Sequence, residues 1–211
     1  MKVTKIFVDT STWWHWFTYK NQESLKEEYA ENAKAFNQIY ENALAEHHIF
    51  RFFYNSRIED ELPEKYRHQT PICFDLIKTS GLLKHVPIPL TRFDGTYKAD
   101  GKSVLGGGEY GGRLRDLLCV DGYDHENKLR EAVPDFNQKN PAHTKPRKKE
   151  FDIEHLESAL ESRADFFITD DVKTILNVLK RCVEKHPDNP DIKRAFQISS
   201  TPIDVLLKII L

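Results

Sequence analysis

Short apolar segments that end in acidic residues constrain the fold of this chain more than any other feature. Near its start, residues 5–8 (Lys-Ile-Phe-Val) lead directly into Asp9, and near its end, residues 164–169 lead into Asp170 and Asp171. Such short runs of aromatic and β-branched residues are typical of buried strands. Amphipathic stretches separate them, and this alternation of strand and helix predicts an α/β domain with a parallel sheet.

The same patterns, followed along the chain, predict a doubly wound parallel sheet flanked by helices. We predict strands at residues 5–8, 49–54, 164–169 and 196–199, and a short extended segment at residues 85–90. We predict helices within residues 21–47, from residue 57, at 70–84, at 152–163, from 170 and from 201 to 211. These elements form one domain over residues 1–211.

One region departs from this pattern. Eight of the nine glycines lie within residues 95–122, and Pro134, Pro141 and Pro146 follow them. Both residue types disfavour the interior of regular elements. We therefore predict that residues 94–150 form an irregular insertion within the single domain, outside the central sheet.

Composition excludes several classes of protein. The 211 residues are 39% hydrophobic, which is enough for one buried core, and a net charge of −2 excludes a uniformly basic nucleic-acid-binding surface. No apolar run approaches the roughly 20 residues of a membrane span. Cys73, Cys119 and Cys182 are widely separated, which disfavours a disulfide framework or a zinc site. We expect a cytoplasmic protein with no membrane contact.

The acidic residues at strand ends suggest a metal site. In a parallel sheet, ligands bind beyond the carboxyl ends of the strands, and Asp9, Asp152 and Asp171 are predicted to lie there, with Glu61 in the helix after the second strand. Four converging carboxylates would repel one another unless a cation neutralised them. Oxygen ligands favour Mg²⁺ or Mn²⁺, which supports hydrolysis of phosphodiesters.

Each carboxylate also has an ordinary structural explanation. Asp152 and Asp171 lie at predicted helix starts, where aspartate caps free N–H groups. Asp9 occupies a common turn position, and Glu61 belongs to an exposed acidic run. Taken one by one these signals are weak, so the metal-site hypothesis rests on their shared edge of the sheet.

Several segments of the chain resemble PIN-domain nucleases. Residues 6–11 (Ile-Phe-Val-Asp-Thr-Ser) resemble the opening strand and aspartate of that family, and residues 55–62 resemble the segment that carries its glutamate. Residues 152–156 match an aspartate followed three positions later by histidine, and residues 164–171 match a strand that ends in Thr-x-Asp. Residues 198–207 resemble the final strand and its proline-started helix.

This resemblance implies a PIN-like fold and a Mg²⁺- or Mn²⁺-dependent endoribonuclease. It implies that Asp9, Glu61, Asp152 and Asp171 are catalytic and hold the metal, and that Thr169 helps to orient the site. Asp60 is a rival for Glu61, and Asp170 is a rival for Asp171. The 91 positions between Glu61 and Asp152 exceed the spacing in compact family members, which disfavours a toxin of a toxin–antitoxin pair.

Two other functions stay open at this point. A PIN-like scaffold can bind RNA or a protein without cleaving, and a structure-specific DNA nuclease on a related fold ranks below both. RNA is the expected partner, and an inhibitory protein and a homodimer are further partners that the sequence leaves open.

Two clusters near the predicted site have competing explanations. A basic run precedes Asp152 and suggests contact with an RNA backbone, although a solvated charge run is the simpler interpretation; its members are Lys145, Arg147, Lys148 and Lys149. Three tryptophans follow the first strand and suit a core, with base stacking as the alternative; they are Trp13, Trp14 and Trp16.

Overall fold

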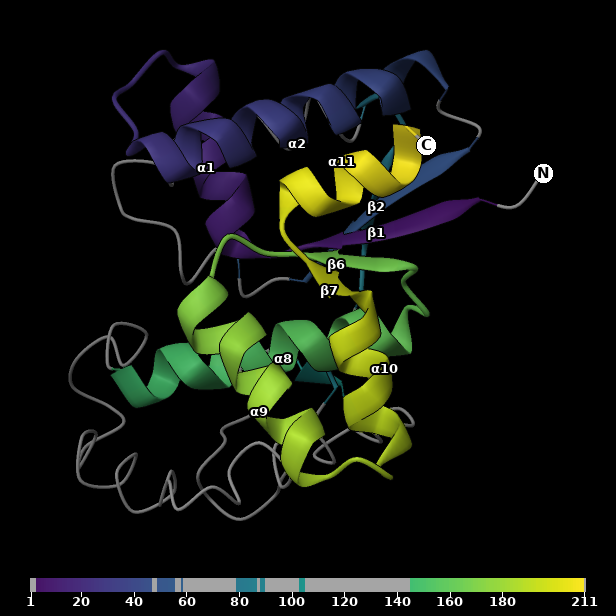
Figure 1. Cartoon of the computed structure of the whole chain (residues 1–211). Coiled ribbons are helices and arrows are strands. Elements are labelled where there is room, and N and C mark those ends of the chain that lie inside the picture. Colours follow the sequence, from purple (N-terminus) through teal and green to yellow (C-terminus); the bar gives the residue numbers. More distant parts are fainter. Residues whose placement is uncertain are drawn as a thin grey trace.

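The computed structural model describes residues 3–46, 49–55, 58, 79–86, 88–89, 103–104 and 145–210. A five-stranded sheet forms the centre of this part, and all of its neighbouring strands pair in parallel (Figure 1). Its order is β3-β2-β1-β6-β7, and its members are β1 (Thr4–Val8), β2 (Phe50–Tyr54), β3 (Leu83–His85), β6 (Phe166–Ile168) and β7 (Ser199–Ser200). The predicted α/β class with a parallel sheet is confirmed.

Helices cover both faces of this sheet. One face carries α1 (Thr10–Lys20), α2 (Glu27–Ala45) and α11 (Pro202–Ile210), as Figure 1 shows. The other face carries α8 (Lys145–Glu161), α9 (Asn177–Lys185) and α10 (Pro190–Ile198), and a π-helical turn, η2 (Val172–Leu176), leads into α9. A separate parallel pair joins β4 (Ile88–Pro89) to β5 (Ser103–Val104).

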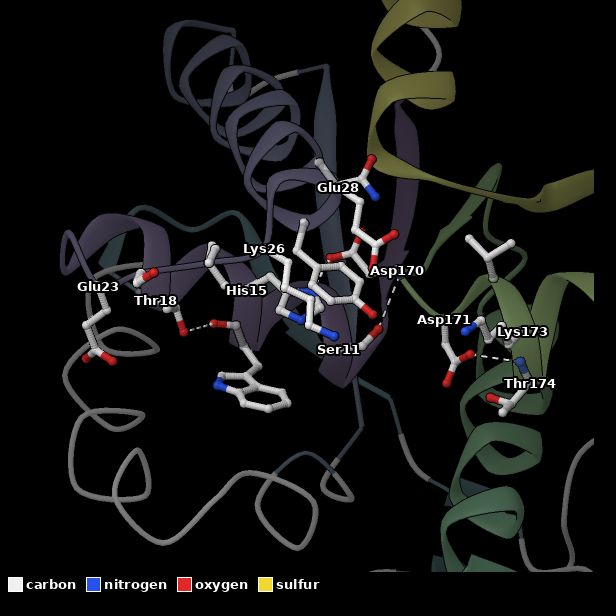
Figure 2. Close-up of a pocket in the computed structure, with 16 residues that line it drawn as sticks. Ser11, His15, Thr18, Glu23, Lys26, Glu28, Asp170, Asp171, Lys173 and Thr174 are labelled. Carbon is white, nitrogen blue, oxygen red and sulfur yellow. Dashed lines mark hydrogen bonds and ion pairs between the residues drawn. The ribbon is translucent and has the colours of Figure 1, made fainter.

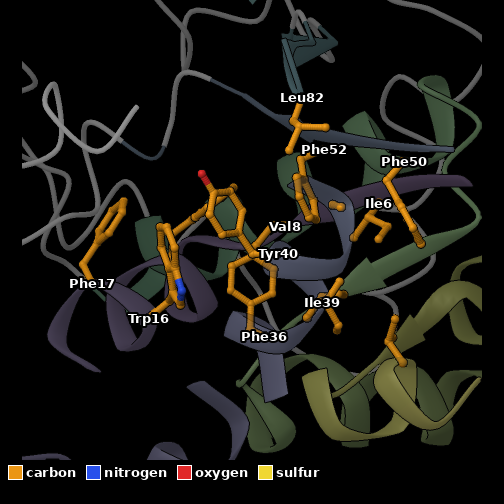
Figure 3. Packing of buried hydrophobic residues seen from close by; sticks show 14 of the residues in the cluster. Ile6, Val8, Trp16, Phe17, Phe36, Ile39, Tyr40, Phe50, Phe52 and Leu82 are labelled. Carbon is orange, nitrogen blue, oxygen red and sulfur yellow. The ribbon is translucent and has the colours of Figure 1, made fainter. Parts of the chain in front are cut away.

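Side chains that alternate along the strands build a core on each face. In β1, Ile6 and Val8 pack with residues of α1 and α2, whereas Phe7 packs with residues of α8, α9 and α10. The first cluster is rich in aromatic rings, and Figure 3 shows Trp16 and Phe36 among them. Because both faces of β1 are buried, this strand reads as a continuous apolar run, and its carboxyl end occupies a fixed place in the fold.

The C-terminal elements differ from the prediction in one respect. Residues 196–198, predicted as part of a strand, belong to α10, and the strand itself is limited to Ser199–Ser200. The cause is a strong helix start, because the Asn189 side chain accepts hydrogen bonds from the N–H groups of Asp191 and Ile192 and Pro190 follows it.

The predicted helix at residues 70–84 is likewise wrong at its end, where Leu83–His85 forms β3.

Helix α8 begins at Lys145, before the predicted start at residue 152. Asp152 therefore lies within the helix and does not cap it, and residues 145–150 of the predicted insertion are helical. Residues 103–104 pair with β4, outside the five-stranded sheet. The other residues of the predicted insertion lie outside the described part of the chain.

Candidate functional site

The carboxyl ends of β1 and β6 meet at the point where the strand order reverses. The chain winds from β1 to β2 and β3 on one side, and returns through β6 to β7 on the other. Asp9 follows β1 and its N–H donates to the carbonyl of Ile168 at 2.9 Å, while the N–H of Thr169 donates to Ser200 at 3.1 Å. Such switch points are the usual ligand sites of open α/β sheets.

Asp9 is a buried carboxylate held by hydroxyl groups. Its side chain is largely enclosed, since Asp9 is only 3% exposed. Its Oδ2 atom accepts hydrogen bonds from Ser11 at 2.6 Å and from Thr169 at 2.9 Å. Its Oδ1 atom lies 3.9 Å from Nε2 of His155, which is also 3.1 Å from the hydroxyl of Thr10. Asp9 occupies the N-cap position of α1, yet its side chain makes no capping hydrogen bond.

A chain of hydrogen bonds continues from Thr169 to α8. The Thr169 hydroxyl accepts from the N–H of Asp171 at 3.0 Å, and the Asp171 carboxylate accepts from the N–H of Thr174 at 2.8 Å. The Thr174 hydroxyl in turn donates to Asp152 at 3.3 Å. Three of the four predicted acidic residues are thus connected at this edge, Asp171 through its backbone N–H to Thr169 and through its carboxylate to Thr174. Asp171 also caps η2, as one of the two sequence hypotheses expected.

The neighbouring Asp170 points the other way, toward α1 and α2. Its fully buried carboxylate lies 2.6 Å from Nδ1 of His15. Burial raises the pKa of Asp170, the hydrogen bond and charge of His15 lower it, and the charge of Asp9 raises it again. Of the two rival aspartates, Asp171 is therefore the one that belongs to the hydrogen-bonded chain leading to Asp152.

A pocket of about 720 Å³ opens beside this edge, between α1, the start of α2 and the turn after β6. Figure 2 shows Ser11, Asp171 and Thr174 on its wall together with residues of the two helices. This volume lies within the range of small-molecule sites, roughly 300–1,000 Å³. The hydroxyl that holds Asp9 and the carboxylate of Asp171 therefore line a space large enough for a ligand.

The remaining predicted site residues come from two other segments of the chain. Glu61 and its rival Asp60 lie outside the described residues. The predicted RNA-binding residues lie in the first turns of α8, upstream of Asp152 on the same helix; they are Lys145, Arg147, Lys148 and Lys149. Within the part of the chain that the structure describes, no three His, Cys, Asp or Glu side chains lie close enough together to hold a metal ion.

Sequence reasoning missed three side chains of this edge. Ser11 is the hydroxyl two positions after Asp9, and Thr174 is three positions after the capping Asp171, so both spacings are visible in the sequence. His15 carries no such signal, because its partner Asp170 is 155 positions away.

Comparison of the chain with protein-family models, with curated proteins and with solved structures finds no match to any of them. None of the helices among the described residues is long and apolar enough to cross a membrane.

Proposed function

We propose that this chain is a PIN-like, Mg²⁺- or Mn²⁺-dependent endoribonuclease whose site lies at the carboxyl ends of β1 and β6. One observation carries the proposal: Asp9, Asp171 and Asp152 are joined through Thr169 and Thr174 by continuous hydrogen bonds at the switch point of the sheet. These residues come from segments that resemble the family at residues 6–11, 152–156 and 164–171. Under this proposal, residues 94–150 are an insertion in a single cytoplasmic PIN-like domain.

The charge at this edge fits a hard cation. Neither Asp9 nor Asp171 has a lysine or arginine within ion-pair distance among the described residues. Their oxygen atoms suit Mg²⁺ or Mn²⁺. Asp9, Asp152 and Asp171 do not lie close enough together to hold an ion on their own, and under the proposal they would hold it together with Glu61. When bound, it supplies an activated water and neutralises charge on the phosphate.

The side chains around the carboxylates have defined tasks in this proposal. Ser11 and Thr169 fix the orientation of Asp9 through its Oδ2 atom, which leaves Oδ1 directed away from both hydroxyls. Thr174 sets the separation of Asp171 from Asp152 because it bonds to both. The basic residues at the start of α8 contact the RNA backbone, since phosphate binding uses Lys and Arg.

The test is cleavage of single-stranded RNA by wild type and Asp9→Asn, with Mg²⁺ or Mn²⁺ and with EDTA. Asparagine keeps an acceptor for the Ser11 and Thr169 hydroxyls but removes the charge, so the variant should fold normally and lose cleavage. Asp188→Asn changes an exposed aspartate in the turn between α9 and α10 and is the matched control. It should cleave like wild type.

Two results would contradict the metal mechanism: full activity in Asp9→Asn, and cleavage that survives EDTA. RNA binding without cleavage under any metal would instead favour the non-catalytic PIN-like module.

A further inference from the structure

We infer that the pocket between α1 and α2 is a nucleobase-binding site in which Trp14 stacks on one base of a single-stranded RNA. The inference rests on the proposed function and adds a recognition site to it. The base would enter beside Trp14, and its attached phosphodiester would stay outside the acidic pocket, on the side that Ser11 and Asp171 line.

The three tryptophans of α1 have separate roles. Trp13 and Trp16 are 0% and 4% exposed and pack against aromatic rings such as Phe36. Trp14 is 37% exposed and lines the pocket. The sequence left core packing and base stacking as alternatives for all three residues. Burial assigns Trp13 and Trp16 to the core, and the pocket assigns the second role to Trp14.

Trp14 belongs to a stack of three roughly parallel rings, those of Trp14, His15 and Tyr29. Its ring centroid lies 5.5 Å from that of His15 at an interplanar angle of 24°, and His15 stacks on Tyr29 at 4.2 Å and 18°. His15 is held from behind by the buried carboxylate of Asp170. The stacked rings therefore have a fixed orientation before a ligand binds, which reduces the entropic cost of binding.

The charges of the pocket favour a base over a phosphate as the group that enters it. Four carboxylates and two lysines line the pocket, so its balance is acidic and would repel a polyanion; they are Glu23, Glu28, Asp170, Asp171, Lys26 and Lys173. A nucleobase is uncharged and presents a π face. Stacking of this kind tolerates any base, because every base has such a face.

Tryptophan fluorescence tests this site without relying on catalysis. Trp14 is the one tryptophan of the chain that is exposed, so a short single-stranded RNA of mixed sequence should quench its emission. The titration is done in EDTA, and an abasic oligonucleotide of the same length keeps the phosphates but removes the bases. We expect the RNA to quench and the abasic strand to leave the emission unchanged.

Three variants give the matched comparison. Trp14→Ala should weaken RNA binding about tenfold, measured by anisotropy of labelled RNA, and Trp14→Phe should recover most of the loss. Tyr19→Ala removes the other exposed aromatic residue of α1, which is outside the pocket, and should bind like wild type. Thermal unfolding of each variant checks that the fold is retained.

The outcomes separate this inference from the proposed function. Equal RNA affinity in Trp14→Ala and wild type, or equal quenching by the abasic strand, would overturn the inference even if metal-dependent cleavage is observed. If RNA quenches the Trp14 emission and Trp14→Ala binds RNA tenfold more weakly, but the wild-type protein cleaves no RNA, the inference is supported and the proposed nuclease activity is overturned.

Discussion

The candidate site has two halves that differ in how they are held. On the α1 side, His15, Asp9 and Asp170 are buried and bonded to groups from distant parts of the chain. On the α8 side, Asp171 and Asp152 are half-buried and share the exposed Thr174. Adjacent aspartates in one turn thus enter opposite environments. The buried half fixes the geometry of the edge, whereas the half-buried carboxylates can exchange partners with a ligand.

Among the changes considered, removal of His15 from the buried half should lower the stability of the protein most. His15→Ala leaves the Asp170 carboxylate buried without its partner at 2.6 Å. Loss of one member of a buried pair is strongly destabilising, so we expect a loss of about 3 kcal/mol in the free energy of unfolding. For a domain of this size the Tm should fall by roughly 6–12 °C, measured by circular dichroism.

A double variant identifies the cause of that loss. His15→Phe combined with Asp170→Leu removes both partners and fills the space with apolar atoms, so it should be more stable than His15→Ala. If both variants unfold at the same temperature, the loss of the His15 partner from the buried Asp170 carboxylate is not the cause.

The pH dependence of stability should show a smaller effect of the buried half, through the titration of Asp170. Burial raises the pKa of Asp170 above its ordinary value of 3.8, even though His15 partly opposes the shift. A group with a raised pKa in the folded state contributes its full stability below the unfolded pKa, and this contribution is lost as pH rises through the folded pKa. We therefore expect the Tm of wild type to fall relative to that of Asp170→Asn as the pH rises from the unfolded to the folded pKa of Asp170.

The measurement is a series of thermal unfolding curves for both proteins from pH 4 upward. A Tm of wild type that rises relative to Asp170→Asn across the same interval would show that the ionised carboxylate stabilises the fold.

Substitution of Asp171 should have the smallest effect on stability. Asparagine is an equally good N-cap, so Asp171→Asn should keep the bond from the Thr174 N–H and change the free energy of unfolding by less than about 0.5 kcal/mol. Under the proposed function, the same variant should lose RNA cleavage. A large drop in Tm, measured beside wild type, would place Asp171 with the buried half.

Local patterns in the sequence were sufficient for much of the fold. The apolar run at residues 5–8 and the segment at 164–169 predicted β1 and β6, because strands that are buried on both faces are short, continuous and apolar. The α/β class followed from their alternation with amphipathic stretches. Asp9 and Asp171 were placed correctly at the carboxyl ends of these strands.

The features that the sequence did not predict depend mostly on contacts between residues far apart in the chain. The sequence suggested a cap role for Asp152, but nothing local revealed that α8 starts at Lys145 and leaves this residue in the helix interior. The bond between His15 and Asp170 joins residues 155 positions apart, and no spacing rule predicts it. The helical run of α1 was also missed, because five consecutive large aromatic-type residues at 13–17 give no single apolar face.

The place of β1 in the middle of the sheet has a consequence for synthesis of the protein. Asp9 leaves the ribosome before Thr169, which donates to it and is 160 residues further along the chain. Until β6 has emerged, the nascent chain carries one half of the acidic edge without the other. Pairing across so many residues is also slow, because closing a long loop costs entropy before contacts form. The nascent chain therefore lacks the complete acidic edge until residue 169 has been added, and a premature stop before that residue yields a product without the bond between Thr169 and Asp9.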